Sequence, residues 1–216
     1  EGSEPDKLGF ALTVQRFLFD PKRPAGAGVR FDGFPSVPAV PGPPKTKPPR
    51  LNKLEGLRGS DPPSAAKRIE ELAEAIRRNP GALTPHYRLG HAYLVKGSWD
   101  DAIRAFSEAI RIRPGFAHAY RHRADARAAK GDFRAAIGDY STAIKLWPAY
   151  AQAYANRGAA HLDLKDGDKA LADFNEAIRL NPELADAYNG RAVVHALRGQ
   201  QQKADADLTK AWRLDQ

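Results

Sequence analysis

Apolar residues return at intervals of 34 positions over residues 83–216, and small and large side chains keep separate places within each interval. The intervals 83–116, 117–150, 151–184 and 185–216 each have a small residue at the eighth position and a large one at the twenty-fourth. These two columns are Gly90, Ala124, Gly158, Ala192 and Phe106, Tyr140, Phe174, Leu208. A proline stands near each boundary, at Pro80, Pro114, Pro148 and Pro182.

Alanine fills two further columns, the twentieth and the twenty-seventh, in all four intervals: Ala102, Ala136, Ala170, Ala204, Ala109, Ala143, Ala177 and Ala211. Two helices approach to about 8–10 Å only where their side chains are small, so these columns predict antiparallel helix pairs. A period of this length is typical of a solenoid, in which each hairpin buries its apolar face against its neighbours. The predicted fold class is therefore all-α, with four stacked helical hairpins.

The segment before the first interval carries only half of this pattern. Ile69, Leu72 and Ile76 fit a second helix, whereas prolines and glycines fill the preceding first-helix position and exclude a helix there. We expect one helix over residues 64–80, with Asp61 or Ser64 as its N-cap, that covers the apolar side of the first hairpin.

Residues 1–63 hold 12 of the 17 prolines and predict an extended N-terminal segment without a core of its own. Residues 8–19 are an apolar exception. Their residues at i, i+4, i+7 and i+8 fit a short amphipathic helix: Phe10, Val14, Phe17 and Leu18. Exposed aromatic side chains are unfavourable in water, so we expect this segment to dock, either on the same chain or on a partner.

The first interval resembles a known repeat family almost position for position, at Leu89, Gly90, Tyr93, Ala102, Phe106, Ala109 and Pro114. The pattern is similar to that of the tetratricopeptide repeat (TPR) family. The resemblance implies a right-handed α-solenoid and a protein–protein interaction module that serves as scaffold, adaptor or assembly factor. An alternative is a fixed structural subunit of a larger complex, held through the N-terminal segment.

The seventh position departs from the family, whose leucine survives only as Leu89. Arginine replaces it in the other three intervals, and in the same three the twenty-third position changes from Ala105 to aspartate. A partly buried guanidinium requires a carboxylate in good geometry. We therefore predict three ion pairs between the helices of one hairpin: Arg123–Asp139, Arg157–Asp173 and Arg191–Asp207.

The resemblance also implies a concave groove lined by four positions of each first helix. The candidate partner-binding residues are Tyr87, Arg88, His91, His118, Arg121, His122, Asp125, Gln152, Asn156 and Asn189. Charged and amide groups in such a row suit an extended peptide, and the basic residues of the first two intervals favour an acidic one. The clamp that chaperone-binding members use is matched only at Asn156, so a chaperone co-factor role is not predicted.

Glycine marks three of the four expected turns between paired helices, at Gly97, Gly131 and Gly199. This is the residue that most easily takes left-handed backbone angles after a helix. Lys165 stands at the corresponding place in the third interval, with Gly167 two residues later. We expect a slightly altered turn around residues 166–168.

Composition narrows the function classes further. The formal net charge of +8 is spread over interleaved acids and bases, so no nucleic-acid partner is expected. No apolar run reaches the roughly 18 residues of a membrane span. No phosphate loop or nucleophile motif is present, and neither an enzyme nor a cofactor is predicted.

Two narrower questions concern metal and location. His118 and His122 lie one helical turn apart, with His91 expected opposite, but no thiolate completes the set and no metal is predicted. The chain has no cysteine and does not begin with Met. These features favour a periplasmic or otherwise exported protein, with a cytoplasmic one as the alternative.

Overall fold

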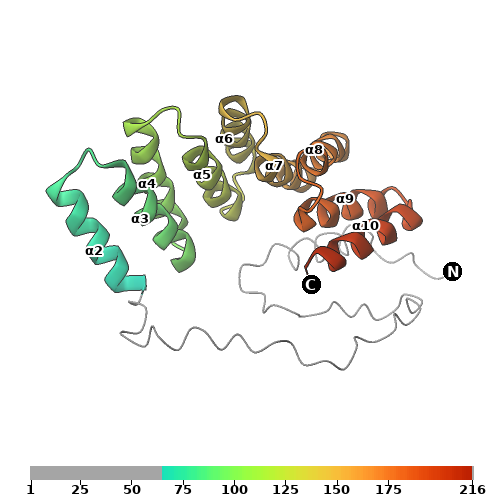
Figure 1. The fold of residues 1–216 in the computed structure, drawn as a ribbon, viewed down its shortest axis with the longest axis horizontal. Helices are drawn as coiled ribbons and strands as arrows, with labels where there is room; N and C mark the ends of the chain where they lie inside the picture. The colour runs from blue at the N-terminus through green and yellow to red at the C-terminus, as the bar shows by residue number, and fades with distance from the viewer. Residues whose placement is uncertain (1–64, 216) are drawn as a thin grey trace, which may run out of the picture.

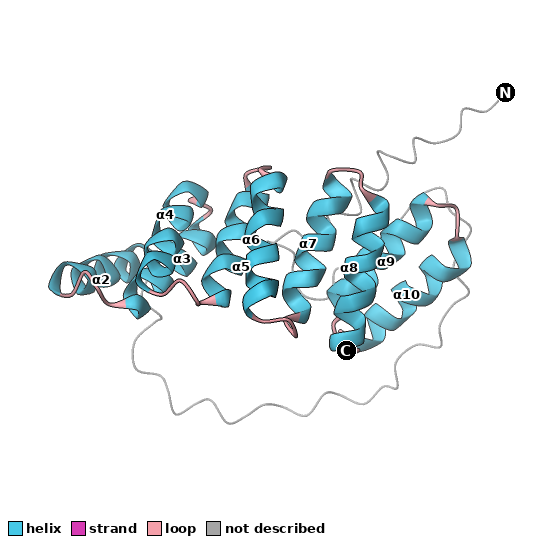
Figure 2. Ribbon diagram, turned by 90° about the horizontal axis from the view of Figure 1, so that it is seen from above, coloured by secondary structure: helices cyan, strands magenta, loops and turns pink. Residues whose placement is uncertain are grey.

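The computed structural model describes residues 65–215, which form nine α-helices and no strand. The first helix is single, and the other eight form four antiparallel hairpins stacked in a row (Figures 1 and 2). In chain order the helices are α2 (Ala65–Arg78), α3 (Leu83–Lys96), α4 (Trp99–Ile112), α5 (Ala117–Ala129), α6 (Phe133–Leu146), α7 (Ala151–Asp163), α8 (Gly167–Leu180), α9 (Ala185–Leu197) and α10 (Gln201–Leu214).

The row curves because its two layers of helices are packed differently. The first helices of successive hairpins, α3, α5, α7 and α9, contact one another directly. Within the described residues, the second helices, α4, α6, α8 and α10, contact first helices but not each other. The first helices therefore form the inner, concave layer, and the second helices spread out on the convex side.

The columns of small and large residues form the core. The alanines of the twentieth and twenty-seventh positions are all at most 1 % exposed, as in Ala102 and Ala109, and the aromatic ring of Phe106 is fully buried between hairpins. A Cβ atom built on Gly90 would lie 2.5 Å from that ring, so only glycine allows this close approach. The predicted alternation of small and large side chains thus lets an aromatic ring of one helix pack directly against the backbone of another.

All four turns inside the hairpins have the same backbone geometry. Gly97, Gly131 and Gly199 take positive φ angles of 76°, 85° and 70°, and Lys165 takes 62°. Asp166 then caps α8 by accepting a hydrogen bond from the Lys169 backbone N–H, as Asp132 does for α6. The expectation of an altered third turn is wrong, because the lysine adopts the left-handed conformation that glycine takes elsewhere.

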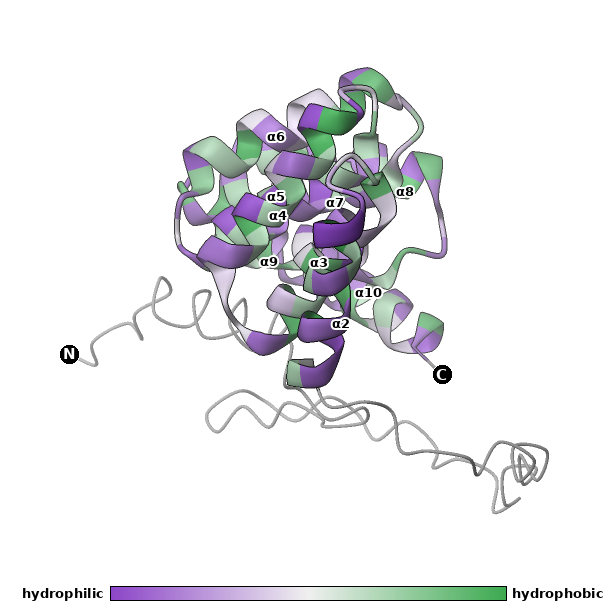
Figure 3. Ribbon diagram, turned by 90° about the vertical axis from the view of Figure 1, so that its left-hand side faces the viewer, coloured by the Kyte–Doolittle hydropathy of each residue, from purple (hydrophilic) through white to green (hydrophobic). Residues whose placement is uncertain are grey.

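The two ends of the row differ. Helix α2 packs on α3 at one end and carries hydrophilic residues on its exposed side (Figure 3). At the other end, α10 leaves Leu208 41 % and Trp212 53 % exposed. Leu208 occupies the column of Phe106 and Phe174, so its exposure marks an edge of the described array on which no further hairpin is stacked. Asp61, Ser64 and the predicted docking segment 8–19 lie outside the described residues.

Candidate functional site

The three predicted Arg–Asp pairs are present and have one geometry. In the second hairpin, Arg123 donates from Nε to Asp139 Oδ2 at 2.8 Å and from Nη2 to Asp139 Oδ1 at 2.7 Å. Arg157–Asp173 and Arg191–Asp207 repeat this two-point arrangement within 0.1 Å. Paired hydrogen bonds between a planar guanidinium and a carboxylate hold the two helices of a hairpin in register.

Each guanidinium also reaches the preceding hairpin. Arg123 Nη1 donates to Ser107 Oγ at 3.0 Å, and the two later arginines donate to Ser141 and Asn175 at 3.0 and 2.8 Å. The ring of Tyr120 lies under Arg123, 5.6 Å from the guanidinium carbon. The pairs are therefore structural joints within and between hairpins, and they lie outside the groove.

The groove side chains centre on Arg121, in the inner layer of the second hairpin. Its Nη1 donates to Asp125 Oδ2 at 3.0 Å, and its Nε donates to the Tyr150 hydroxyl at 2.7 Å. Its Nη2 lies 2.6 Å from His122 Nε2, while His122 Nδ1 lies 3.2 Å from Asp125 Oδ2. These contacts fit a neutral imidazole that accepts from Arg121 and donates to Asp125.

Asp125 extends the network to the second helix of its own hairpin and to the third hairpin. Its Oδ1 accepts from the Tyr140 hydroxyl at 2.7 Å and from Asn156 Nδ2 at 2.8 Å. Asn156 Oδ1 in turn accepts from Gln152 at 2.9 Å, and Gln152 also donates to Asp186 at 3.3 Å. The result is one connected row of polar side chains from the second hairpin to the fourth.

Burial sets the charge of Asp125 and His122 in opposite ways. Burial alone would raise the pKa of Asp125, but the hydrogen bond from His122 and the charge of Arg121 outweigh it and leave the pKa lowered. Burial lowers the pKa of His122, and the charge of Arg121 acts in the same direction. At neutral pH the centre of the groove therefore holds an ion pair and an uncharged imidazole.

Aromatic rings cover the first-hairpin end of this network. The His91 and His122 rings meet edge to face with centroids 4.0 Å apart, and Tyr87 lies 4.7 Å from His91. Burial lowers the pKa of His91 to about 4, and the charge of Arg121 acts in the same direction. Burial also lowers the pKa of His118. The positive charge expected in this half of the groove thus comes from arginine and not from histidine.

A second ring cluster lies beside Arg121. The Trp147 and Tyr150 rings stack with centroids 4.4 Å apart, and His118 lies 5.2 Å from Tyr150. Trp147 is 41 % exposed, so this aromatic cluster is partly accessible to solvent beside Arg121. The groove therefore presents hydrogen-bonding groups and an aromatic surface side by side.

The structure joins eight of the ten predicted groove residues through hydrogen bonds or ring contacts. The two outside these contacts are Arg88 and Asn189, and Arg88 is exposed and forms no ion pair with a described residue. Sequence reasoning missed Tyr140 and Tyr150. The column of Phe106 and Phe174 carried a signal for Tyr140, because the hydroxyl appears only in the hairpin that has Asp125.

Two further properties concern metals and membranes. Among residues 65–215, no three histidine, cysteine, aspartate or glutamate side chains are grouped to hold a metal ion. No helix in the same range combines the length and apolar character of a membrane span.

The geometry defines the class of protein as an α-solenoid of helical hairpins with a polar concave face. Sequence profiles then identify the repeat: one described as tetratricopeptide repeat matches residues 85–116 and 151–184, and one described as TPR repeat matches residues 124–165. The chain is a tetratricopeptide repeat protein and, at that level, a protein–protein interaction module. No curated protein sequence matches it significantly.

Solved structures share the fold. MamA from Desulfovibrio magneticus is 20 % identical, with a TM-score of 0.64 over 71 % of this chain and 86 % of that one. A thermophilic TPR protein of Thermus thermophilus is 21 % identical, with a TM-score of 0.60 over 69 % and 82 %. The first TPR of Spaghetti, solved with the HSP90 peptide SRMEEVD, is 25 % identical, with a TM-score of 0.53 over 54 % and 93 %.

Proposed function

We propose that the protein binds an extended segment of a partner protein along its concave groove and acts as an adaptor or scaffold. The observation that carries the proposal is the polar row between Arg121 and Asp186 on the inner helices. An extended peptide exposes unpaired backbone N–H and C=O groups, and a row of amides, hydroxyls and imidazoles can satisfy them.

The network supports binding because it fixes these side chains before a ligand arrives. Asp125 accepts from Arg121, Tyr140 and Asn156, so none of the four side chains can turn without breaking a hydrogen bond. Groups held in this way lose little conformational entropy when a partner binds. The same rigidity would favour one peptide register over others.

The charges at the two ends of the groove favour one orientation of the bound segment. Arg88 is an exposed cation without an ion pair to a described residue at the first-hairpin end, whereas Asp186 is an exposed carboxylate at the fourth. An acidic residue of the partner segment would therefore lie near the first hairpin. The Spaghetti TPR bound to SRMEEVD supports an acidic ligand for this type of groove.

The proposal is tested by selecting ligands from a displayed library of random peptides, each about 12 residues long, on the full chain. We expect enriched sequences with aspartate or glutamate at one end, bound about tenfold more weakly by Arg88→Ala as measured by calorimetry. Affinity should also fall as NaCl rises from about 50 to about 500 mM, because salt screens the exposed charge pair.

Arg134→Ala is the matched control. Arg134 is also an exposed arginine without an ion pair among the described residues, but it lies on α6, in the outer layer. The two variants change the net charge equally and should differ only in peptide affinity. Equal effects, or selected peptides without acidic residues, would refute an acidic ligand in the groove.

The alternative, a fixed structural subunit, gives a different result in native extract. Such a subunit would co-purify with its partners in fixed proportion at about 500 mM NaCl, and Arg88→Ala would not release them. A groove adaptor would lose its partner under both conditions.

A further inference from the structure

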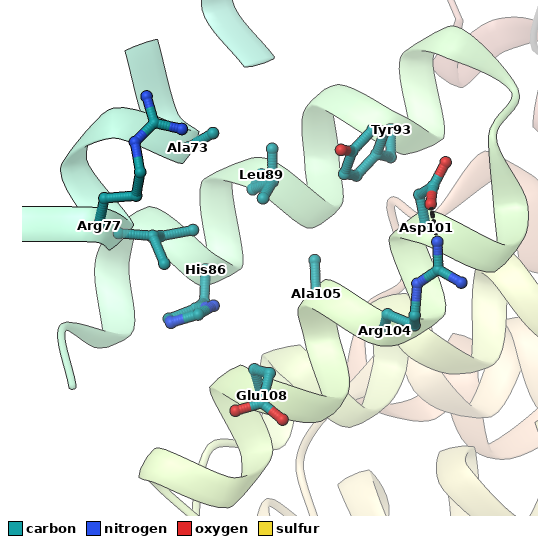
Figure 4. Close-up of a pocket in the computed structure, with 10 residues that line it drawn as sticks. Ala73, Arg77, His86, Leu89, Tyr93, Asp101, Arg104, Ala105 and Glu108 are labelled. Atoms are coloured by element: carbon teal, nitrogen blue, oxygen red, sulfur yellow. Dashed lines mark hydrogen bonds and ion pairs between the residues drawn. The ribbon is translucent and has the colours of Figure 1, made fainter. Parts of the chain in front are cut away.

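A pocket of about 380 Å³ lies at the first hairpin and is lined by α2, α3 and the outer-layer helix α4 (Figure 4). Its apolar lining comes from all three helices: Ala73, Ile76, Leu89 and Ala105. The rim carries Arg77, Asp101, Arg104 and Glu108. The pocket shares no residue with the polar row.

The pocket occupies the place of an ion pair. In the other hairpins this position holds an arginine, its aspartate and a serine or asparagine of the preceding hairpin, as in Arg157, Asp173 and Ser141. Counting back 34 residues from each repeat places Leu89, Ala105 and Ala73 at the same three positions. All three polar groups are replaced together by shorter or apolar side chains, which leaves space and removes the charge.

The charged rim requires no charged ligand. Arg77 pairs with Glu74, Arg104 with Asp101, and Arg111 with Glu108, each within a single helix. Such pairs leave the rim close to neutral, so an occupant gains chiefly by burying apolar surface against Leu89 and Ile76.

We propose that this pocket holds the apolar face of residues 8–19 of the same chain, formed by Phe10, Val14, Phe17 and Leu18. That segment is apolar over its whole length except for polar Thr13 and Gln15 and a single charge at Arg16, which matches a near-neutral apolar pocket. Docking would cover both the pocket and the aromatic side chains of the segment, whose exposure to water would be unfavourable.

The position of the segment in the chain favours this occupant over an outside partner. The undescribed N-terminal part ends where Ala65 begins α2, and α2 supplies Ala73 and Ile76 to the pocket. Residues 20–64 connect the two and, at about 3.1 Å per residue in extended form, reach far beyond the distance needed. A tether of this kind gives an effective concentration on the order of millimolar.

The test compares hydrogen exchange in the full wild-type chain with that in the triple variant Ala73→Ser/Leu89→Arg/Ala105→Asp. The variant copies the ion pair of the other hairpins into the pocket, so α3 and α4 should stay folded with an unchanged melting temperature. We expect amides of residues 8–19 to exchange at least about tenfold more slowly in the wild type than in the variant.

A second variant tests the contact from the other side. Phe17→Asp/Leu18→Asp should speed hydrogen exchange in the α2 and α3 peptides around Ile76 and Leu89. It changes no residue of the helices α2–α10, so it remains a valid test if the triple variant fails to fold. Protection of residues 8–19 should not change between about 50 and about 500 mM NaCl, which separates it from salt-sensitive binding in the groove.

Three results would overturn the proposal. One is fast exchange of residues 8–19 in the wild type; another is equal protection in the wild type and the triple variant, which would place the segment elsewhere. The third is protection that disappears on roughly hundredfold dilution, which would show that the segment docks on a second copy.

Discussion

The first hairpin and the three that follow it fill the same position with opposite chemistry. Hairpins two to four place an arginine, an aspartate and a hydroxyl or amide there, whereas the first has Leu89, Ala105 and Ala73. The backbone is the same in both cases, so the helix pair is set by the alanine columns and not by the ion pair. What the pair adds is a filled space and a fixed register, and its absence leaves the first hairpin with a pocket.

The inner layer shows a related contrast along its length. Arg121 and Asp125 form a charged centre in the second hairpin, whereas the corresponding positions of the third and fourth include the buried Ala155 and Val193. The groove is therefore uneven, with charged groups and rings concentrated at one end and apolar residues at the corresponding positions of the other. Partner contacts are expected where the side chains remain accessible, from Arg88 in the first hairpin to Asp186 in the fourth.

The largest effect is expected from breaking one ion pair. Asp173→Ala leaves the Arg157 guanidinium without its carboxylate at a site where the arginine side chain is only 21 % exposed. The free energy of unfolding should fall by about 3 kcal/mol, the low end of the usual range because the arginine keeps some water. Urea denaturation followed by circular dichroism measures this change.

The double variant Arg157→Leu/Asp173→Ala is the control, because it reproduces Leu89 and Ala105, the two first-hairpin residues that stand in place of the ion pair. It should recover most of the lost stability, since two apolar groups replace a pair whose desolvation is costly. If the double variant is as unstable as Asp173→Ala, the ionic and apolar versions of this position are not interchangeable.

The fold could be predicted from the sequence because each hairpin repeats one packing arrangement. Gly90 and Phe106 could be matched as neighbours from their columns alone, and the Arg–Asp pairs followed from comparing one interval with the next. Repetition supplies several observations of one contact, which a single non-repetitive chain does not offer.

The groove was harder to predict because it depends on side-chain direction and burial. Tyr150 lies in the connection after the second hairpin, and no column indicates that its hydroxyl meets Arg121. From the sequence, His91 and His122 were grouped with the basic residues of the groove. Burial lowers the pKa of both, so they are uncharged at neutral pH. The backbone of Lys165 was missed because the cost of its φ angle is small beside the packing of two helices.

An intermediate effect is expected at Asp163, which is half-buried near the end of α7. Burial raises the pKa of its carboxyl group from 3.8 to about 6. Between these two values the unfolded chain has lost the proton that the folded chain retains, so the free energy of unfolding falls as pH rises and the full penalty applies above about pH 6. A shift of this size corresponds to about 3 kcal/mol, and partial solvent access reduces it to about 1–2 kcal/mol.

Asp163→Asn should therefore stabilise the protein by about 1–2 kcal/mol at about pH 7.5. The gain should shrink to about a third at about pH 4.5. At that pH the folded carboxyl is protonated, and the pH is only slightly above the pKa of the unfolded one. Denaturation curves at the two pH values provide the comparison. A gain that is the same at both would show that the aspartate is not buried in its charged form. The corresponding residue of the second hairpin, Ala129, carries no such pH dependence.

The smallest effect is expected from making the third turn equal to the others. Lys165 holds a φ of 62°, which costs a side-chain-bearing residue about 1–2 kcal/mol, and glycine removes that cost but adds freedom to the unfolded chain. Lys165→Gly should thus raise the free energy of unfolding by about 0.5–1 kcal/mol. Gly131→Lys is the reverse exchange, at a turn with φ 85° and no atom within 4 Å of an added Cβ. It should lower the free energy of unfolding by a similar amount. If both variants shift the free energy of unfolding in the same direction, the third turn differs from the second in more than the φ angle of this residue. The four hairpins would then share their core packing but not their turns.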